Sequence, residues 1–162
     1  MKLIGISNCI KIKFSYFTKS NSGKNLAEEK YYLEIESDPN NLITVEEFIN
    51  YFSKDLGLDD DKLSALLLAV TEATTNAIIH GNKGDKKKLV RIRAKIVDGK
   101  LNVIVKDEGV GFRPEKVPDP TDPENLLKDS GRGLYLMRVY MDDLKYNITP
   151  DGTETILILN IN

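Results

Sequence analysis

The stretch Leu63–Gly81, LSALLLAVTEATTNAIIHG, decides how the rest of the 162-residue chain is read. Its residues favour a helix, and Gly81 is suited to ending one. Apolar residues recur at the helical period, so one face is predicted to be buried. That face consists of Leu63, Leu66, Leu67, Val70, Thr74, Ala77 and Ile78. Because Leu68, Ala69 and Ile79 fall outside it, the helix is expected to be covered on more than one side.

Three polar residues interrupt this apolar helix at four-residue intervals. Glu72, Asn76 and His80 therefore follow one another along a single ridge. A carboxylate in such surroundings must find a partner or take up a proton, because an isolated buried charge is costly. Glu72 and Asn76 offer a carboxylate and an amide oxygen one turn apart, which suits a hydrated Mg²⁺ ion. On these two residues alone, pairing with other protein groups is the alternative interpretation.

The composition restricts the classes of protein to consider. With 41% hydrophobic and 30% charged residues, the chain is predicted to be a soluble globular domain. A net charge of −2 does not indicate a nucleic-acid or membrane partner, and no apolar run is expected to cross a bilayer. Cys9 is the only cysteine, which favours a reducing compartment, so a cytoplasmic location is expected. The N-terminus has too short an apolar stretch for a signal peptide.

The chain contains a single histidine, His80. A histidine autokinase needs a phosphoacceptor imidazole on a separate helical dimerisation segment, whereas this imidazole falls inside the apolar helix. We therefore do not expect the chain to be a complete two-component sensor kinase.

The remaining sequence predicts an alternation of strands and helices. The order is a strand, two helices, two strands, a long proline-containing loop, a helix and two strands, at about residues 30–36, 38–56, 63–81, 89–97, 101–106, 113–130, 133–142, 144–148 and 153–161. Residues 1–27 are expected to be an N-terminal arm or an extra strand, and 28–162 the main domain. This order predicts an α/β (α+β) two-layer sandwich: a mixed, mainly antiparallel sheet with helices on one face. The mostly apolar last strand is expected inside the sheet.

A second motif, D-x-G-x-G, follows the predicted strand 101–106. Asp107 is followed by Gly109 and Gly111. A carboxylate here can accept a hydrogen bond from an exocyclic amine such as adenine N6, whereas guanine has a carbonyl at that position. The glycines allow a backbone to approach a ligand without a Cβ clash. A bulged turn after a strand has the same pattern, so both interpretations stay open for this motif alone.

A third motif, Ser130-Gly131-Arg132-Gly133, precedes a predicted helix. Free backbone N–H groups at a helix start, together with the helix dipole, favour an anion such as phosphate. Glycines that merely begin a helix after a loop are the alternative. The loop 113–130 before this motif is long for a compact domain, and loops of that length are usually functional.

The three motifs, in this order and separated by a long loop, resemble those of the GHKL superfamily, which includes gyrase B-type, mismatch-repair and histidine-kinase ATP sites. The resemblance covers about residues 28–162 and implies the Bergerat ATP-binding fold. The segments TEATTNAIIHGN, KDEGVGF and SGRGLYLMR are most similar to the bacterial anti-sigma factor serine/threonine kinases. Gly152-Thr153 resembles the closing Gly-Thr of the superfamily.

The resemblance implies a role for each matching residue. Asn76 would hold Mg²⁺, and Glu72 would orient or deprotonate the attacking hydroxyl. Asp107 would read the adenine of ATP, and the Thr153 hydroxyl would help to hold it. Arg132 would either approach the terminal phosphate or point to solvent. The pocket and its lid would be shaped by four glycines, Gly109, Gly111, Gly131 and Gly133.

The resemblance also implies a function. It is that of an ATP-dependent protein serine/threonine kinase that phosphorylates a serine on a STAS-type anti-sigma factor antagonist and sequesters a sigma factor. A homodimer is expected from the resemblance and from an exposed strand at Lys30–Glu36. The alternative is a catalytically weak, ATP-dependent module that switches partners. An ATPase fragment of the gyrase or mismatch-repair kind is disfavoured, because no room remains for the domain that couples hydrolysis to dimer motion.

The chain departs from the family at one place. Some members carry a basic side chain just before the Ser-Gly of the third motif, whereas Lys128 and Asp129 precede Ser130 here. The phosphate contact would then come from Lys128 or Arg132, or be absent. This difference bears on catalytic rate more than on ATP binding.

Overall fold

A computed structural model describes residues 2–3, 11–14, 31–111 and 132–161. The strands are β1 Lys2–Leu3, β2 Lys11–Phe14, β3 Tyr31–Glu36, β4 Leu89–Val97, β5 Lys100–Lys106, β6 Asp143–Thr149 and β7 Gly152–Asn160. They form one seven-stranded sheet in the order β1-β2-β3-β4-β5-β7-β6. Each neighbouring pair of these strands is antiparallel. As predicted, β7 lies inside the sheet.

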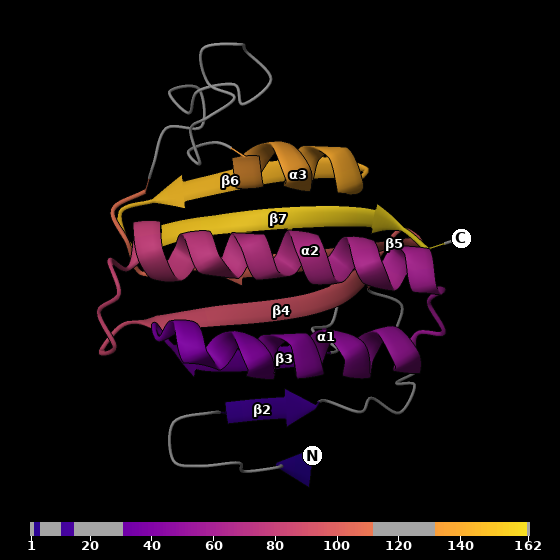
Figure 1. Ribbon diagram of the computed structural model, residues 1–162, viewed down its shortest axis with the longest axis horizontal. Helices are drawn as coiled ribbons and strands as arrows, with labels where there is room; N and C mark the ends of the chain where they lie inside the picture. The colour runs from indigo at the N-terminus through magenta and orange to yellow at the C-terminus, as the bar shows by residue number, and fades with distance from the viewer. Residues whose placement is uncertain (1, 4–10, 15–30, 112–131, 162) are drawn as a thin grey trace, which may run out of the picture.

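The helices are α1 Leu42–Asp55, preceded by a 3₁₀ turn at Pro39–Asn41, then α2 Asp60–Asn76 and α3 Arg132–Tyr140. All three lie on the same face of the sheet (Figure 1). This arrangement confirms the predicted two-layer sandwich. The division of the chain into 1–27 and 28–162 stays a prediction.

Local sequence signals account for where these elements begin and turn. Asp59 caps α2, because its side chain accepts a hydrogen bond from the backbone N–H of Lys62 at 2.8 Å. The hairpin between β4 and β5 turns at Asp98 and Gly99, which have positive φ angles of 51° and 75°. Two such residues between antiparallel strands match the twist of the strands they join.

The N-terminal edge of the sheet differs from expectation. β2 pairs along β3, from Lys11 opposite Glu34 to Phe14 opposite Tyr31. The backbone groups on that side of β3 therefore bond to β2, and β3 is not a free edge. The expectation of an exposed strand at Lys30–Glu36, which was one reason to expect a dimer, is therefore wrong.

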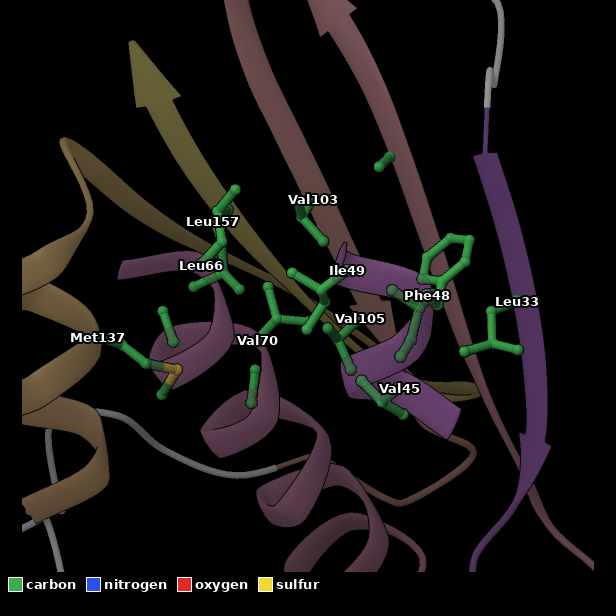
Figure 2. Close-up of a cluster of buried hydrophobic side chains, with 14 of the residues drawn as sticks. Leu33, Val45, Phe48, Ile49, Leu66, Val70, Val103, Val105, Met137 and Leu157 are labelled. Atoms are coloured by element: carbon green, nitrogen blue, oxygen red, sulfur yellow. The ribbon is translucent and has the colours of Figure 1, made fainter. Parts of the chain in front are cut away.

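The core lies between the sheet and α2, which packs against both α1 and α3. Figure 2 shows side chains of α1, α2 and α3 meeting those of β3, β5 and β7 in this layer. The largest fully buried residues are Phe52, Leu33, Ile35, Ile49, Leu66, Ile78, Ile92, Leu101, Met137, Leu157, Val45 and Val70. The predicted buried face of α2 is confirmed at Leu66, Val70 and Ile78, whereas Ile79 is 46% exposed.

The segment Asp60–Gly81 is long and apolar enough to cross a membrane by length and composition, contrary to the expectation from the sequence. Its packing gives another reason for that composition. The helix lies over the sheet between two other helices. Protein therefore covers more of its circumference than it covers on a helix at the surface. The core helix of a folded domain has this property.

Candidate functional site

The polar ridge of α2 faces the start of α3. Glu72 and Asn76 are both partly buried, one turn apart on α2. A Cβ built on Gly133 would overlap the Glu72 carboxylate. Only glycine at this position therefore allows the two helices to approach so closely. The structure thus brings Glu72 of the first motif against Gly133 of the third.

Glu72 lies in a setting that favours the proton-bound form of its carboxyl. Burial raises the pKa of Glu72 above its ordinary value of 4.5, and the charge of His80 opposes this shift only in part. Among the residues that the structure describes, Glu72 and Asn76 have no side-chain hydrogen bond or ion pair. A carboxylate whose pKa is raised by burial is a stronger base than an exposed one, which suits it to accepting a proton.

The helix widens directly after Asn76. Ala77–Gly81 forms a π-helical turn, closed by a hydrogen bond of 2.8 Å from the Asn82 N–H to the Ala77 carbonyl. Single π turns of this kind inside α-helices are frequent at functional sites. The helix was predicted to stop at Gly81, and the extra width of its last turn was not predicted.

The second motif forms a tight turn around one buried carboxylate. Asp107 is 7% exposed. Its Oδ1 accepts hydrogen bonds from the N–H groups of Gly109 at 2.7 Å and Thr153 at 3.1 Å. Its own N–H donates to the Thr153 carbonyl at 3.0 Å. Within the described part of the chain, Oδ2 has no hydrogen-bond partner and is available for a ligand.

Thr153 lies beside Asp107 at the start of β7, and its side chain also has hydrogen-bonding capacity left. Its hydroxyl Oγ1 is buried and has no hydrogen-bond partner among the described residues. A buried hydroxyl without a partner is costly and rare, which points to a ligand that completes it. Asp107 Oδ2 and Thr153 Oγ1 together offer an acceptor and a donor to the edge of a base, so the residues present fit the adenine of a nucleotide.

Glycines allow the Asp107 turn to sit directly on the end of the α2 segment. A Cβ on Gly81 would lie 2.6 Å from Asp107 Cγ, and one on Gly109 would overlap the Gly81 carbonyl. Gly152, with φ 131°, passes against the Asp107 carbonyl in the same way. Gly111 has φ 83°, a conformation that favours glycine. The contact of Gly81 with the Asp107 turn is not evident from the sequence.

The third motif is described in part. Arg132 is exposed at the first residue of α3, and Gly133 follows it. Gly131, with Lys128 and Asp129 before it, lies outside the described residues. The described half of the motif therefore supplies the helix start and the contact with Glu72.

The described residues contain no cluster of three or more His, Cys, Asp or Glu that could hold a metal ion. This is compatible with Mg²⁺ at a phosphate-transfer site, because Mg²⁺ there takes one or two protein ligands and completes its shell with phosphates and water. The free amide oxygen of Asn76 is suited to be such a ligand.

Two residues that hold the Asp107 turn were not assigned from the sequence. Asn82 is the last residue of the segment TEATTNAIIHGN, and Glu108 lies within KDEGVGF. Both make several hydrogen bonds within the described structure. Their place in these two segments was the only signal for a role of either residue.

Comparison with known proteins agrees with this geometry. The model of the histidine kinase-like ATPase domain matches residues 35–159. The anti-sigma F factor of Clostridium perfringens (strain ATCC 13124) is 36% identical over 107 residues, which is 63% of this chain and 75% of that protein. The serine-protein kinase RsbW of Bacillus subtilis (strain 168) is 38% identical over 96 residues, 56% of this chain and 60% of that protein.

A solved structure shares the fold. The RsbU and RsbW domains of Rv1364c from Mycobacterium tuberculosis match with a TM-score of 0.59 and 19% identity, covering 80% of this chain and 32% of that chain. This chain therefore spans about a third of that longer protein. The family match covers most of the sheet, α1, α2 and α3, and includes every described residue of the three motifs. The chain belongs to the histidine kinase-like ATPase domain family, the GHKL superfamily that its motifs resemble.

Proposed function

We propose that the protein is an ATP-dependent protein serine/threonine kinase of the anti-sigma factor type. The observation that carries the proposal is the half-buried Glu72 carboxylate beside the helix start at Gly133, where it has no hydrogen bond or ion pair with another described residue. A nucleotide-binding module without catalysis has no need of a carboxylate whose pKa is raised at this place. The family match and the similarity to an anti-sigma F factor and to a serine-protein kinase support the same function.

The base of ATP is held at the Asp107 turn. Asp107 Oδ2 accepts a hydrogen bond from the exocyclic amine of adenine, while Oδ1 stays bonded to backbone N–H groups. The Thr153 hydroxyl, which is buried beside it, completes its hydrogen bonding with the base or with a water that the base holds in place. Guanine lacks the amine at this position, so adenine is selected.

The phosphates and the attacking hydroxyl lie at the α2–α3 end of the site. The first N–H groups of α3, from Gly133 onward, face the phosphate oxygens. The Asn76 amide oxygen is a ligand to Mg²⁺, which when bound neutralises charge on the phosphates. Glu72 accepts the proton of the substrate serine hydroxyl as that oxygen attacks the terminal phosphorus. The phosphoryl group passes to the serine, and ADP is the leaving group.

The proposed protein substrate is a serine on a STAS-type anti-sigma factor antagonist, and the proposed second partner is a sigma factor, which the chain sequesters. Phosphorylation adds negative charge to the contact surface of the antagonist and weakens its docking. We further propose a homodimer and a cytoplasmic location. The name of the relative anti-sigma F factor supports the sigma factor as a partner, and the antagonist and the homodimer are proposed from the resemblance of the motifs.

The decisive experiment changes only the proton acceptor. Glu72→Gln keeps the shape of the side chain but removes its basicity, so phosphoryl transfer to the antagonist should fall by roughly a hundredfold or more, while the Kd of ATP changes little. Glu46→Gln, on the exposed face of α1, is the matched control and should transfer phosphate as the wild type does. Transfer by Glu72→Gln at the wild-type rate would remove the base assignment.

A partner-switching module without efficient catalysis is the second candidate, and Asp129 before Ser130 is the observation that favours it. The two candidates are separated by isolating the tagged protein from its host in the presence of ATP. A kinase should co-elute with a small partner that carries phosphoserine after incubation. A binding module should co-elute with the same partner in unmodified form.

A further inference from the structure

Asn82 lies at a junction of four chain segments. It is 1% exposed and immediately follows the π-helical turn Ala77–Gly81. Its Nδ2 donates to Ser37 Oγ at 2.8 Å and to the Leu89 carbonyl at 3.0 Å. Its Oδ1 accepts from the Glu108 N–H at 2.7 Å. Both amide protons and the amide oxygen are therefore used, and the last bond reaches the residue next to Asp107.

Glu108 holds the same turn from the other side. Its carbonyl accepts a hydrogen bond from Lys88 Nζ at 3.1 Å. Its carboxylate accepts from the Leu89 N–H at 3.0 Å through Oε2 and forms an ion pair with Arg91 Nη1 at 2.8 Å through Oε1. The backbone N–H, the carbonyl and both carboxylate oxygens of Glu108 are all bonded to groups outside the motif.

These contacts leave the Asp107 side chain little freedom to move. Glu108 separates Asp107 from Gly109, so fixing its N–H and carbonyl fixes the peptide planes on both sides of it. On the inner side, Gly81 lies against the Asp107 carboxylate and directly precedes Asn82. The turn at Asp107 is thus held between the residues that follow α2, Gly81 and Asn82, and the start of β4.

We infer that Asn82 and Glu108 are positioning residues that aim the free carboxylate oxygen of Asp107 at the base of the nucleotide. The inference rests on the proposed function, because it assumes that Asp107 reads adenine. Neither side chain is bonded to the Asp107 carboxylate, so each acts through the backbone of the turn. A displacement of about 1 Å at a binding group is enough to lose much of its contribution.

Two variants test the inference with two ligands. Asn82→Ala removes the acceptor of the Glu108 N–H, and Glu108→Ala removes both carboxylate contacts. For each, titration calorimetry compares Mg²⁺–ATP with Mg²⁺–tripolyphosphate, which has the phosphates but no base. We expect the Kd of ATP to rise about tenfold or more in both variants, in line with the loss of an oriented hydrogen bond, and the Kd of tripolyphosphate to stay within about twofold.

Glu34→Ala is the matched control. Glu34 bonds to the same arginine, Arg91, through Nε at 2.9 Å, but it lies on β3 away from the turn. It should leave the Kd of both ligands within about twofold of the wild type. The Glu108 side chain is 30% exposed, so Glu108→Ala is expected to fold. If Asn82→Ala fails to fold, the result with Glu108→Ala decides the question.

Three outcomes overturn the inference. A folded Glu108→Ala that binds ATP as tightly as the wild type shows that the turn needs no such support. An equal rise in the Kd of both ligands shows that the two residues have a general structural role and do not orient Asp107 toward the base. Failure of the wild type to bind ATP removes the proposed function together with the inference, and it is distinguishable because no variant is needed to observe it.

Discussion

The two carboxylate oxygens of Asp107 differ in their contacts within the described residues. Oδ1 accepts two backbone N–H groups, from Gly109 and Thr153, which fixes the plane of the carboxylate. Oδ2 has no such bond, and the buried hydroxyl of the neighbouring Thr153 also has no partner among the described residues. Through Oδ1 the side chain joins the end of β5 to the start of β7, and in the proposed function Oδ2 is the oxygen that reads the base.

This division predicts the effect of Asp107→Asn. The amide keeps an oxygen for the two backbone N–H groups but presents an NH₂ where Oδ2 was. Two donors then face each other, and ATP binding should be largely abolished, by about a hundredfold or more in Kd. Calorimetry with Mg²⁺–ATP measures this, with thermal unfolding to show that the variant is folded. An unchanged affinity would remove the adenine role of Asp107.

Glu72 predicts a pH-dependent effect on stability. Burial raises its pKa in the folded protein above the ordinary value of 4.5. The native state then binds more protons than the unfolded state between these two values, so stability falls as the pH rises through that window. Glu72→Gln cannot ionise. It should therefore be more stable than the wild type at about pH 7.5, and the difference should vanish below about pH 4.

Urea unfolding of the wild type and Glu72→Gln at both pH values measures this difference. Glu46→Gln, on an exposed site, is the control and should show no such trend. A Glu72→Gln variant that is less stable than the wild type at neutral pH would show that the carboxylate has a stabilising partner in solution.

At the scale of elements, α2 and α3 meet through the smallest residue. Gly133 lies in the first turn of α3, and its missing side chain leaves the space that the Glu72 carboxylate occupies. Helices usually lose stability through an internal glycine. Here glycine is needed because a Cβ at this position would overlap the Glu72 carboxylate of α2.

Gly133→Ala should consequently be destabilising, although alanine is otherwise favoured over glycine in a helix by roughly 1 kcal/mol. We expect a loss of about 1–3 kcal/mol in the free energy of unfolding, the usual cost of overpacking. In the Glu72→Ala background the overlapping atoms are gone, so the same change should be neutral or stabilising. A double-mutant cycle by denaturant unfolding measures the coupling; additive effects would show that the two residues do not touch.

At the scale of the whole molecule, one face of the sheet is covered by helices and the other is lined by ion pairs. On the outer face Arg91 bridges Glu34 and Glu108, and Arg93 pairs with Glu154 at 2.8 Å. β2 occupies the edge of β3 that was expected to be free. A dimer would therefore have to use a surface other than that edge.

The predicted homodimer is tested by light scattering at high protein concentration, with and without Mg²⁺–ATP. We expect the mass of two chains, on the basis of the family resemblance. Deletion of residues 1–14 removes β1 and β2 and exposes the edge of β3. If the full chain has the mass of a monomer and only the deletion variant associates, the dimer expected for the full chain is wrong.

The sequence by itself determined the order of the elements and the place of each motif on them. Helix caps such as Asp59, the Asp98-Gly99 turn and the apolar period of α2 act over a few residues, so they can be recognised without knowing what lies opposite. The same holds for the position of Glu72 on a helix and of Asp107 after a strand. These local signals were sufficient for the fold class and for the family.

Only the tertiary structure decided which of these residues meet. The contact of Glu72 with Gly133, the use of Asp107 Oδ1 by Thr153 and the three bonds of Asn82 all join segments far apart in the sequence. An asparagine after a glycine has the same local pattern whether it forms a turn or ties four segments together. Such contacts depend on how the layers pack, which no short stretch of the chain encodes.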